Sequence, residues 1–157
     1  MQVFLNRYFL FLQKTLSGLL ILLLIPVLLQ VFSRLIPFIP RYIWTEELAR
    51  FAFVWIIMLG SSVAVRDQSH FYVDLLPNSW SKYGHLLRLV GFVFMLLLAL
   101  VFLIGGYYFT QFGATQHSEI AGLPMWVIYI AWPLAGLSWI LFLVEQVYQE
   151  FRSRETI

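Results

Sequence analysis

The chain contains no cysteine and very little charge. Without cysteine, disulfides, thiolate-bound metals and thiol catalysis are excluded. Only 11% of the 157 residues are charged, against about 25% in ordinary soluble domains, while 61% are hydrophobic. Such a chain has too few polar side chains to cover a water-soluble globule, so we expect an integral membrane protein. The net charge of +2, from scattered basic residues, also argues against a nucleic-acid partner.

Catalytic chemistry is sparse as well. The three histidines, His70, His85 and His117, fall in predicted connections and not deep in facing helices, where a bis-histidine haem would need them. His70 and Asp74 are spaced for a hydrogen bond on one helical turn, but the further ligands of a metal site are missing. No nucleophile-elbow or phosphate-loop pattern occurs. We therefore expect neither an enzyme nor a bound cofactor.

Long apolar runs predict an all-α integral membrane protein with four transmembrane helices and short interfacial helices. The predicted spans cover about 12–32, 43–65, 89–112 and 124–148, and residues 1–157 form a single membrane domain. Residues 1–14 are expected to form an amphipathic, partly interfacial lead-in, and 78–88 a short interfacial helix. The first apolar run is longer than a signal-peptide core and lacks a small-residue cleavage site, so we expect it to be retained. Pro26 and Pro133 predict kinks.

The distribution of lysine and arginine predicts the orientation. Seven basic residues lie on one side of the predicted spans and two, Arg34 and Arg41, on the other; the seven are Arg7, Lys14, Arg66, Lys82, Arg88, Arg152 and Arg154. Because cytoplasmic segments carry the excess of basic residues, both termini are expected in the cytoplasm. The two outer loops then cover about 34–43 and 111–123.

The second predicted span is charged at both ends. Its uncharged run, 51–65, is shorter than the roughly 20 residues that a spanning helix needs, so the span must extend into its charged ends. Arg50 can pair with Glu46 or Glu47 on one helix face. Two interpretations stay open: Arg50 and Arg66 extend their side chains to the two membrane interfaces, or this face docks against another protein.

No charge is predicted near the middle of any span, so a transport pathway through this chain alone is not expected. The chain instead suggests a scaffold that faces lipid and a partner. The candidate subunit-interface or lipid-anchor residues are Trp44, Glu46, Glu47, Arg50, Arg66, His70, Asp74, Lys82 and Arg88.

Several short motifs, in a fixed order, carry a family resemblance. They are W-x-E-E-x-x-R at 44–50, L-G-S-S-V-A-V-R at 59–66, H-F-Y-V-D at 70–74 and G-L-P-M-W at 122–126, followed by Pro133 and Gly136. Over about residues 10–148 the chain resembles the small, DctQ-like membrane subunit of tripartite ATP-independent periplasmic (TRAP) transporters.

This resemblance implies a bacterial inner-membrane protein that works beside a much larger membrane subunit holding the substrate and sodium sites. A periplasmic binding protein would deliver the substrate, an organic acid such as a dicarboxylate or a sialic acid. The small subunit would anchor the static frame of an elevator-type transporter driven by the sodium gradient. No motif identifies the substrate.

Two alternatives come from other classes. The chain could be the membrane anchor of a respiratory enzyme that binds quinone or haem, although the positions of the histidines argue against this. It could also be a self-assembling four-span structural protein, which would require no large partner.

Overall fold

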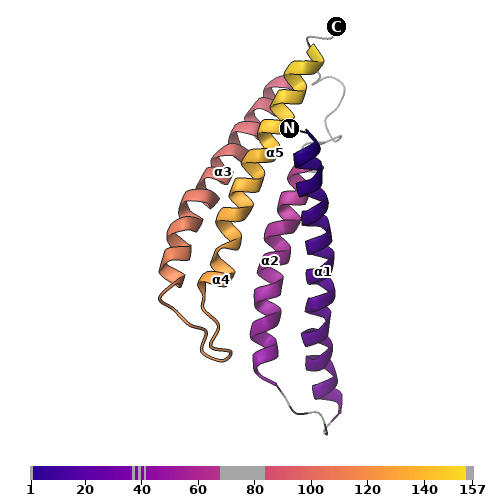
Figure 1. The fold of residues 1–157 in the computed structure, drawn as a ribbon, viewed down its shortest axis with the longest axis vertical. Coiled ribbons are helices and arrows are strands. Elements are labelled where there is room, and N and C mark those ends of the chain that lie inside the picture. The colour runs from indigo at the N-terminus through magenta and orange to yellow at the C-terminus, as the bar shows by residue number, and fades with distance from the viewer. Residues whose placement is uncertain (1, 37, 39, 41, 68–83, 155–157) are drawn as a thin grey trace.

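The computed structural model describes residues 2–36, 38, 40, 42–67 and 84–154. This part of the chain forms α1 (Gln2–Leu35), α2 (Trp44–Arg66), α3 (Gly84–Gly113), the single turn α4 (Trp126–Tyr129) and α5 (Ala131–Arg154), with no β-strand in the described ranges (Figure 1). Four helical stretches are long and apolar enough to cross a membrane: Val3–Leu35, Trp44–Arg66, Leu89–Gly113 and Trp126–Tyr148. The predicted fold class, an all-α membrane protein with four spanning helices, is confirmed.

Helix α1 is one continuous element, whereas the sequence suggested a separate lead-in over residues 1–14. No glycine or proline interrupts it before Gly18, and Leu5 and Leu12 are buried in the core. Its 34 residues extend about 51 Å, well beyond a hydrocarbon core of about 30 Å. The predicted lead-in is therefore the first part of α1, and it packs one face, with Leu5 and Leu12, against the core.

The helices form two hairpins, α1 with α2 and α3 with α5, and the hairpins meet along α2 and α5. Figure 1 shows them close together at the end that carries both termini and diverging towards the other end. In the most apolar 18-residue segment of each stretch, 6% of the residues are buried in α1 and 11% in α3, but 44% are buried in the α4–α5 stretch. Thus α2 and α5 are central, while α1 and α3 turn most of their apolar surface outwards.

The core lies where α1, α2, α3 and α5 come together. Its buried members are Leu5, Leu12, Leu59, Val65, Ala99, Trp139, Phe142 and Leu143. The ring of Phe142 packs against Tyr8 and Phe9 of α1, with centroids 5.9 and 6.3 Å apart. The Tyr8 and Ser138 hydroxyls are hydrogen-bonded at 2.7 Å. Aromatic packing therefore ties the start of α1 to α5.

Helices α3 and α5 approach closely because small residues line their seam. A Cβ atom on Gly136 would lie 2.7 Å from the carbonyl oxygen of Ala99 and from the backbone nitrogen of Leu103. Small side chains let helix backbones approach where lipid supplies no hydrophobic drive.

The two interior prolines have different outcomes. Helix α1 runs through Pro26 without a break. Near Pro133, α4 ends at Tyr129 and α5 begins at Ala131. Proline lacks an N–H, and its ring clashes with the carbonyl four residues earlier, here that of Tyr129. The kink predicted at Pro133 is therefore a short interruption between two helices.

Candidate functional site

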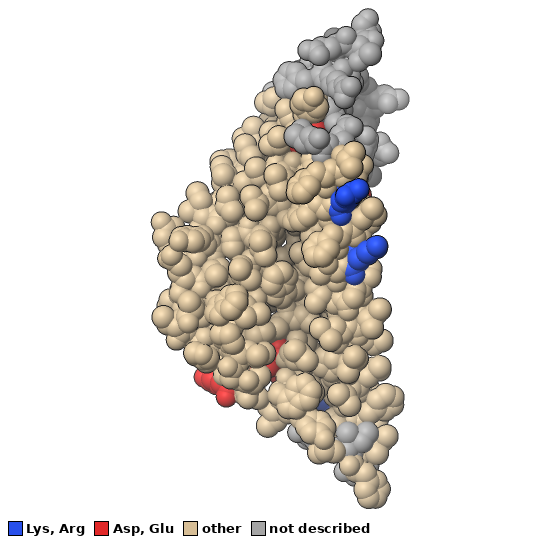
Figure 2. Space-filling view, in the orientation of Figure 1, with Lys and Arg blue, Asp and Glu red and all other residues tan. Residues whose placement is uncertain are grey.

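Charged side chains bracket a broad uncharged band. In α1, no charged residue lies between Lys14 and Arg34. These two residues are about 30 Å apart along the helix axis, close to the thickness of a hydrocarbon core. Figure 2 shows this face as mostly uncharged, with basic side chains over α1 and acidic side chains near the lower end. We call the end with the start of α1 and the end of α2 the terminal end, and the end with Trp44 and residues 114–125 the loop end.

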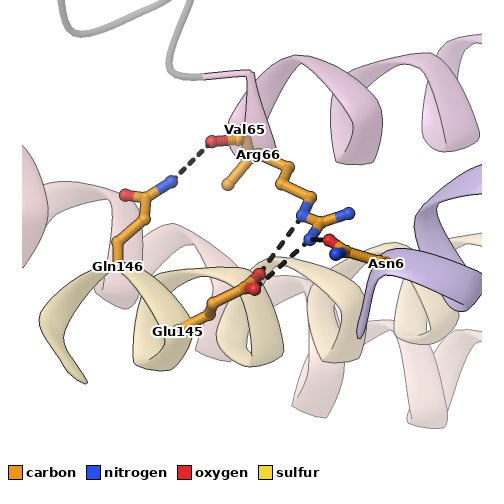
Figure 3. Close-up of polar contacts among 5 residues, drawn as sticks. All are labelled: Asn6, Val65, Arg66, Glu145 and Gln146. Atoms are coloured by element: carbon orange, nitrogen blue, oxygen red, sulfur yellow. Dashed lines mark hydrogen bonds and ion pairs between the residues drawn. The ribbon is translucent and has the colours of Figure 1, made fainter. Parts of the chain in front are cut away.

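At the terminal end, Arg66 and Glu145 form a salt bridge across α2 and α5. Arg66 Nε lies 3.2 Å from Glu145 Oε2, and its Nη2 lies 3.2 Å from Oε1, so the pairing is bidentate (Figure 3). The side chains are 14% and 5% exposed. Arg66 Nη2 also donates to Asn6 Oδ1 of α1. One guanidinium thus joins three helices.

The surroundings of this pair strengthen the contact. The Arg66 guanidinium carbon lies 4.6 Å from the ring centroid of Phe9 and 5.4 Å from that of Phe142. Such cation–π contacts gain strength where water is excluded. Gln146 Nε2 donates to the Val65 carbonyl at 2.8 Å, which satisfies one of the carbonyls left open where α2 ends. The cluster therefore also caps α2.

The structure turns Arg66 inwards, where the sequence suggested a lipid anchor or a contact with a partner. Glu145 was not among the predicted site residues. One signal could have indicated it: Glu145 is the only charged residue in the apolar run 124–148. Its predicted membrane side is the same as that of Arg66.

At the loop end, the paired glutamates have different environments. Glu47 is only 5% exposed, and its Oε2 accepts the backbone N–H of Ala121 at 2.6 Å. The buried Ser118 hydroxyl lies beside the same carboxylate. Glu46 is exposed. The first turn of α2 thus holds the loop between α3 and α4 through one carboxylate and leaves the other outside.

Arg50 is exposed and, within the described ranges, forms no salt bridge with either glutamate. The pairing that helical spacing allows is therefore not made. Trp44 is also exposed, with its ring 6.1 Å from that of Tyr42. Trp44, Glu46 and Arg50 keep surface that lipid or a partner can reach.

The loop that Glu47 holds is a narrow hairpin. Ser118 N–H donates to the Leu123 carbonyl at 2.8 Å, and Met125 N–H donates to the Gln116 carbonyl at 3.0 Å. Gly122, at φ +65°, supplies the left-handed backbone that its turn requires. A hollow of about 470 Å³ lies between this hairpin and α2, lined by Glu47, Arg50, Gln116, His117, Ser118, Glu119, Ile120 and Met125.

The remaining predicted site residues are not placed by the structure. His70, Asp74 and Lys82 lie outside the described residues, and Arg88 lies in α3 with its side chain outside the described part. Of the histidines, His117 is exposed and lines the hollow. In the ranges that the structure covers, no group of three His, Asp or Glu side chains is arranged to hold a metal.

Four long apolar helices with charged contacts near their ends are typical of a multi-pass membrane protein. The family model described as "Tripartite ATP-independent periplasmic transporters, DctQ component" matches residues 23–153, and the chain belongs to this family. The family comprises permease subunits of transporters and not enzymes. The resemblance seen in the motifs is thus confirmed.

Three curated relatives agree with this assignment. A "Putative TRAP transporter small permease protein" of Haemophilus influenzae is 29% identical over 94 residues, which cover 59% of this chain and 58% of the relative. The C4-dicarboxylate TRAP transporter small permease protein DctQ of Rhodobacter capsulatus is 31% identical over 99 residues, 60% of this chain and 43% of the relative. The sialic acid TRAP transporter permease protein SiaT of Haemophilus influenzae is 44% identical over 68 residues, 43% of this chain and 11% of the relative. The matched segments thus cover less than two-thirds of each relative.

Proposed function

We propose that this chain is the small, non-catalytic membrane subunit of a sodium-coupled, binding-protein-dependent transporter for organic acids in the bacterial inner membrane. The observation that carries the proposal is the lack of charged residues in the middle of the spanning helices that the structure describes. The stretch Leu89–Gly113 of α3 has no charge, and α2 is uncharged from Phe51 to Val65. Since conduction needs polar groups near the midplane, substrate passes through a partner and not through this bundle.

The role of this chain is to enlarge and fix the static frame of a large, elevator-type subunit. Two features of the bundle support this role. Helices α1 and α3 turn most of their apolar surface outwards, where a membrane partner or lipid covers it. The polar contacts near both ends of α2 join the two hairpins into one unit. A moving transport domain needs such a fixed neighbour.

The names of two relatives support the proposed substrate class. One is named for sialic acid and another for C4-dicarboxylates. Both compounds are carboxylic acids, so an organic acid is the proposed substrate, delivered to the complex by a periplasmic binding protein.

The exposed residues Trp44, Glu46 and Arg50 are the proposed contact with the large subunit or its surrounding lipid, together with His70, Asp74, Lys82 and Arg88. An Arg50→Ala variant tests this contact. We expect normal expression of the small subunit but a reduced yield of co-purified large subunit. Unchanged co-purification and transport would leave Arg50 as a lipid anchor only.

Reconstitution into liposomes tests the function as a whole. This chain alone should give no uptake of an organic acid under an inward sodium gradient, and adding the large subunit and the binding protein should give uptake. Collapsing the sodium gradient should abolish that uptake. Uptake by the isolated chain would contradict the scaffold role, and uptake without a sodium gradient would contradict the coupling.

A further inference from the structure

Several polar contacts join the hairpins, and the two that involve a carboxylate lie near the two ends of α2. Glu47 of α2 accepts the N–H of Ala121, in the loop that follows α3. Arg66 of α2 pairs with Glu145 of α5. Glu47 and Arg66 are separated by a rise of about 28 Å along the helix, close to the thickness of a hydrocarbon core. We call these two contacts the loop-end tie and the terminal-end tie.

Between the ties, the α2–α5 seam is mainly apolar. Its buried members include Met58, Leu59, Ala131 and Ala135. Trp55 Nε1 adds one hydrogen bond, to the Val127 carbonyl of α4 at 3.0 Å. In lipid, no hydrophobic force presses two apolar helices together, and dispersion contacts impose little directional preference. The apolar seam therefore permits tilting that directional polar bonds would prevent.

Both ties have the geometry needed to prevent such tilting. The Arg66–Glu145 contact is bidentate and largely buried, so it fixes orientation as well as distance. The Glu47 carboxylate is buried against a loop that its own backbone hydrogen bonds hold in a hairpin. Neither contact is a flexible pair of exposed side chains.

We propose that Glu47 and Arg66 are positioning residues that fix the angle between the α1–α2 and α3–α5 hairpins, each at its own end of the bundle. Buried polar contacts of this kind can specify a geometry that apolar packing of the same shape leaves loose. Losing one tie opens the end where it lies and leaves the other end closed. The proposal concerns the full chain alone and does not depend on which substrate the transporter carries.

Distances between spin labels on the two hairpins test this directly. Because the chain has no cysteine, two introduced cysteines carry the labels without further changes. Phe11→Cys with Phe94→Cys reports on the terminal end, and Val31→Cys with Tyr108→Cys on the loop end. All four side chains are exposed and lie on α1 or α3. Pulsed electron spin resonance of the full chain in lipid nanodiscs should give one narrow distance distribution for each pair.

The loop-end tie is tested with variants of Glu47. Glu47→Met removes the acceptor at similar length and should broaden the loop-end distribution while the terminal-end distribution stays narrow. Glu47→Gln keeps an acceptor for Ala121 and should restore the narrow distribution. Glu46→Met, at the exposed neighbouring carboxylate, is the matched control and should change neither distance.

The terminal-end tie is tested with a paired replacement. Arg66→Met combined with Glu145→Met removes both charges of the salt bridge together and should broaden the terminal-end distribution alone. Arg34→Met, at an exposed arginine, is the control. Arg66→Lys keeps the charge but loses the planar fork, so it should also broaden this distribution.

The outcomes separate the proposal from a general loss of packing. Narrow distributions in folded Glu47→Met and in the paired variant would overturn it, and so would equal broadening at both ends in either one. If Glu47→Met does not fold, Ala121→Pro removes the same hydrogen bond from the loop side and must broaden the loop end. If the paired variant does not fold, Arg66→Lys gives the decisive measurement.

Discussion

At the scale of single residues, Arg66 shows how a chain with little charge places a cation inside its helices. The partners of its guanidinium are a bidentate carboxylate, an amide oxygen and two aromatic rings. Arg66 lies in the last turn of α2, where a positive charge also favours the negative end of the helix dipole. The contribution of Arg66 to the stability of the folded protein therefore depends on all of these partners together.

We expect the single change Arg66→Ala to destabilise the protein strongly. It leaves the Glu145 carboxylate buried without its bidentate cation, and breaking a buried pair in this way costs about 3–5 kcal/mol. Replacing both residues by methionine should cost much less, because the two charges of the pair are removed together. Thermal unfolding in detergent micelles measures both effects.

Arg50→Ala is the control for that measurement. Arg50 is exposed and forms no salt bridge in the described residues, so its loss should change stability by less than about 1 kcal/mol. Equal losses for Arg66→Ala and Arg50→Ala would show that the Arg66–Glu145 pair is not desolvated.

Residue spacing predicted where charges would gather but not what each would bind. Glu46 and Glu47 are equivalent by spacing to Arg50, yet about 100° of rotation separates them on a helix, and only Glu47 faces the loop. Arg66 meets Glu145 across a sequence separation of 79 residues. Local periodicity carries no information about such a partner, because it depends on how whole helices pack.

At the scale of the helices, the α3–α5 seam depends on a missing side chain. The close neighbours of Gly136 are backbone atoms of Ala99, Phe102 and Leu103, which cannot move aside as a flexible side chain would. Gly136→Ala should therefore force α3 and α5 apart and lower stability by about 1–3 kcal/mol, as overpacking does in tight cores. Thermal unfolding in detergent micelles provides the measurement.

Gly105→Ala, in α3, is the matched control for Gly136→Ala. Nothing lies within 4 Å of a Cβ atom at Gly105, and alanine favours a helix over glycine by about 1 kcal/mol. Its stability should be unchanged or higher. If both alanine variants lose stability alike, the loss reflects glycine's role in the helix backbone and not the close approach at Gly136.

The helices themselves were predictable because an apolar run of this length has few other ways to satisfy its backbone in a membrane. Helix α2 covers Trp44–Arg66 where the sequence predicted a span over 43–65. The merging of residues 1–14 into α1 was not predicted, because the mixed polarity of this segment fits an interfacial helix equally well. Its burial against α5 comes from Tyr8 and Phe9, whose partners lie far along the chain.

At the scale of the whole molecule, the order of the helices could not be predicted. A helix that is apolar on all sides has no contrast between an apolar and a polar face, so its sequence does not indicate which face is buried. The central place of α2 and α5 therefore follows from the contacts near their ends and from the α3–α5 seam. Since α1 and α3 lie outside, a partner or lipid meets these two helices first.

The orientation of the bundle in the membrane is the last prediction. The basic residues predicted on the cytoplasmic side all belong to the terminal end or to segments adjoining it, so that end should face the cytoplasm and the loop end should face outwards. Thr115 is exposed at the loop end and Asp67 at the terminal end, and the cysteine-free parent gives no background labelling. A membrane-impermeant maleimide should label Thr115→Cys in intact spheroplasts and label Asp67→Cys only after the membrane is permeabilised. The reverse pattern would place the Glu47 tie in the cytoplasm, out of reach of a periplasmic binding protein, and would contradict the orientation on which the proposed delivery of substrate depends.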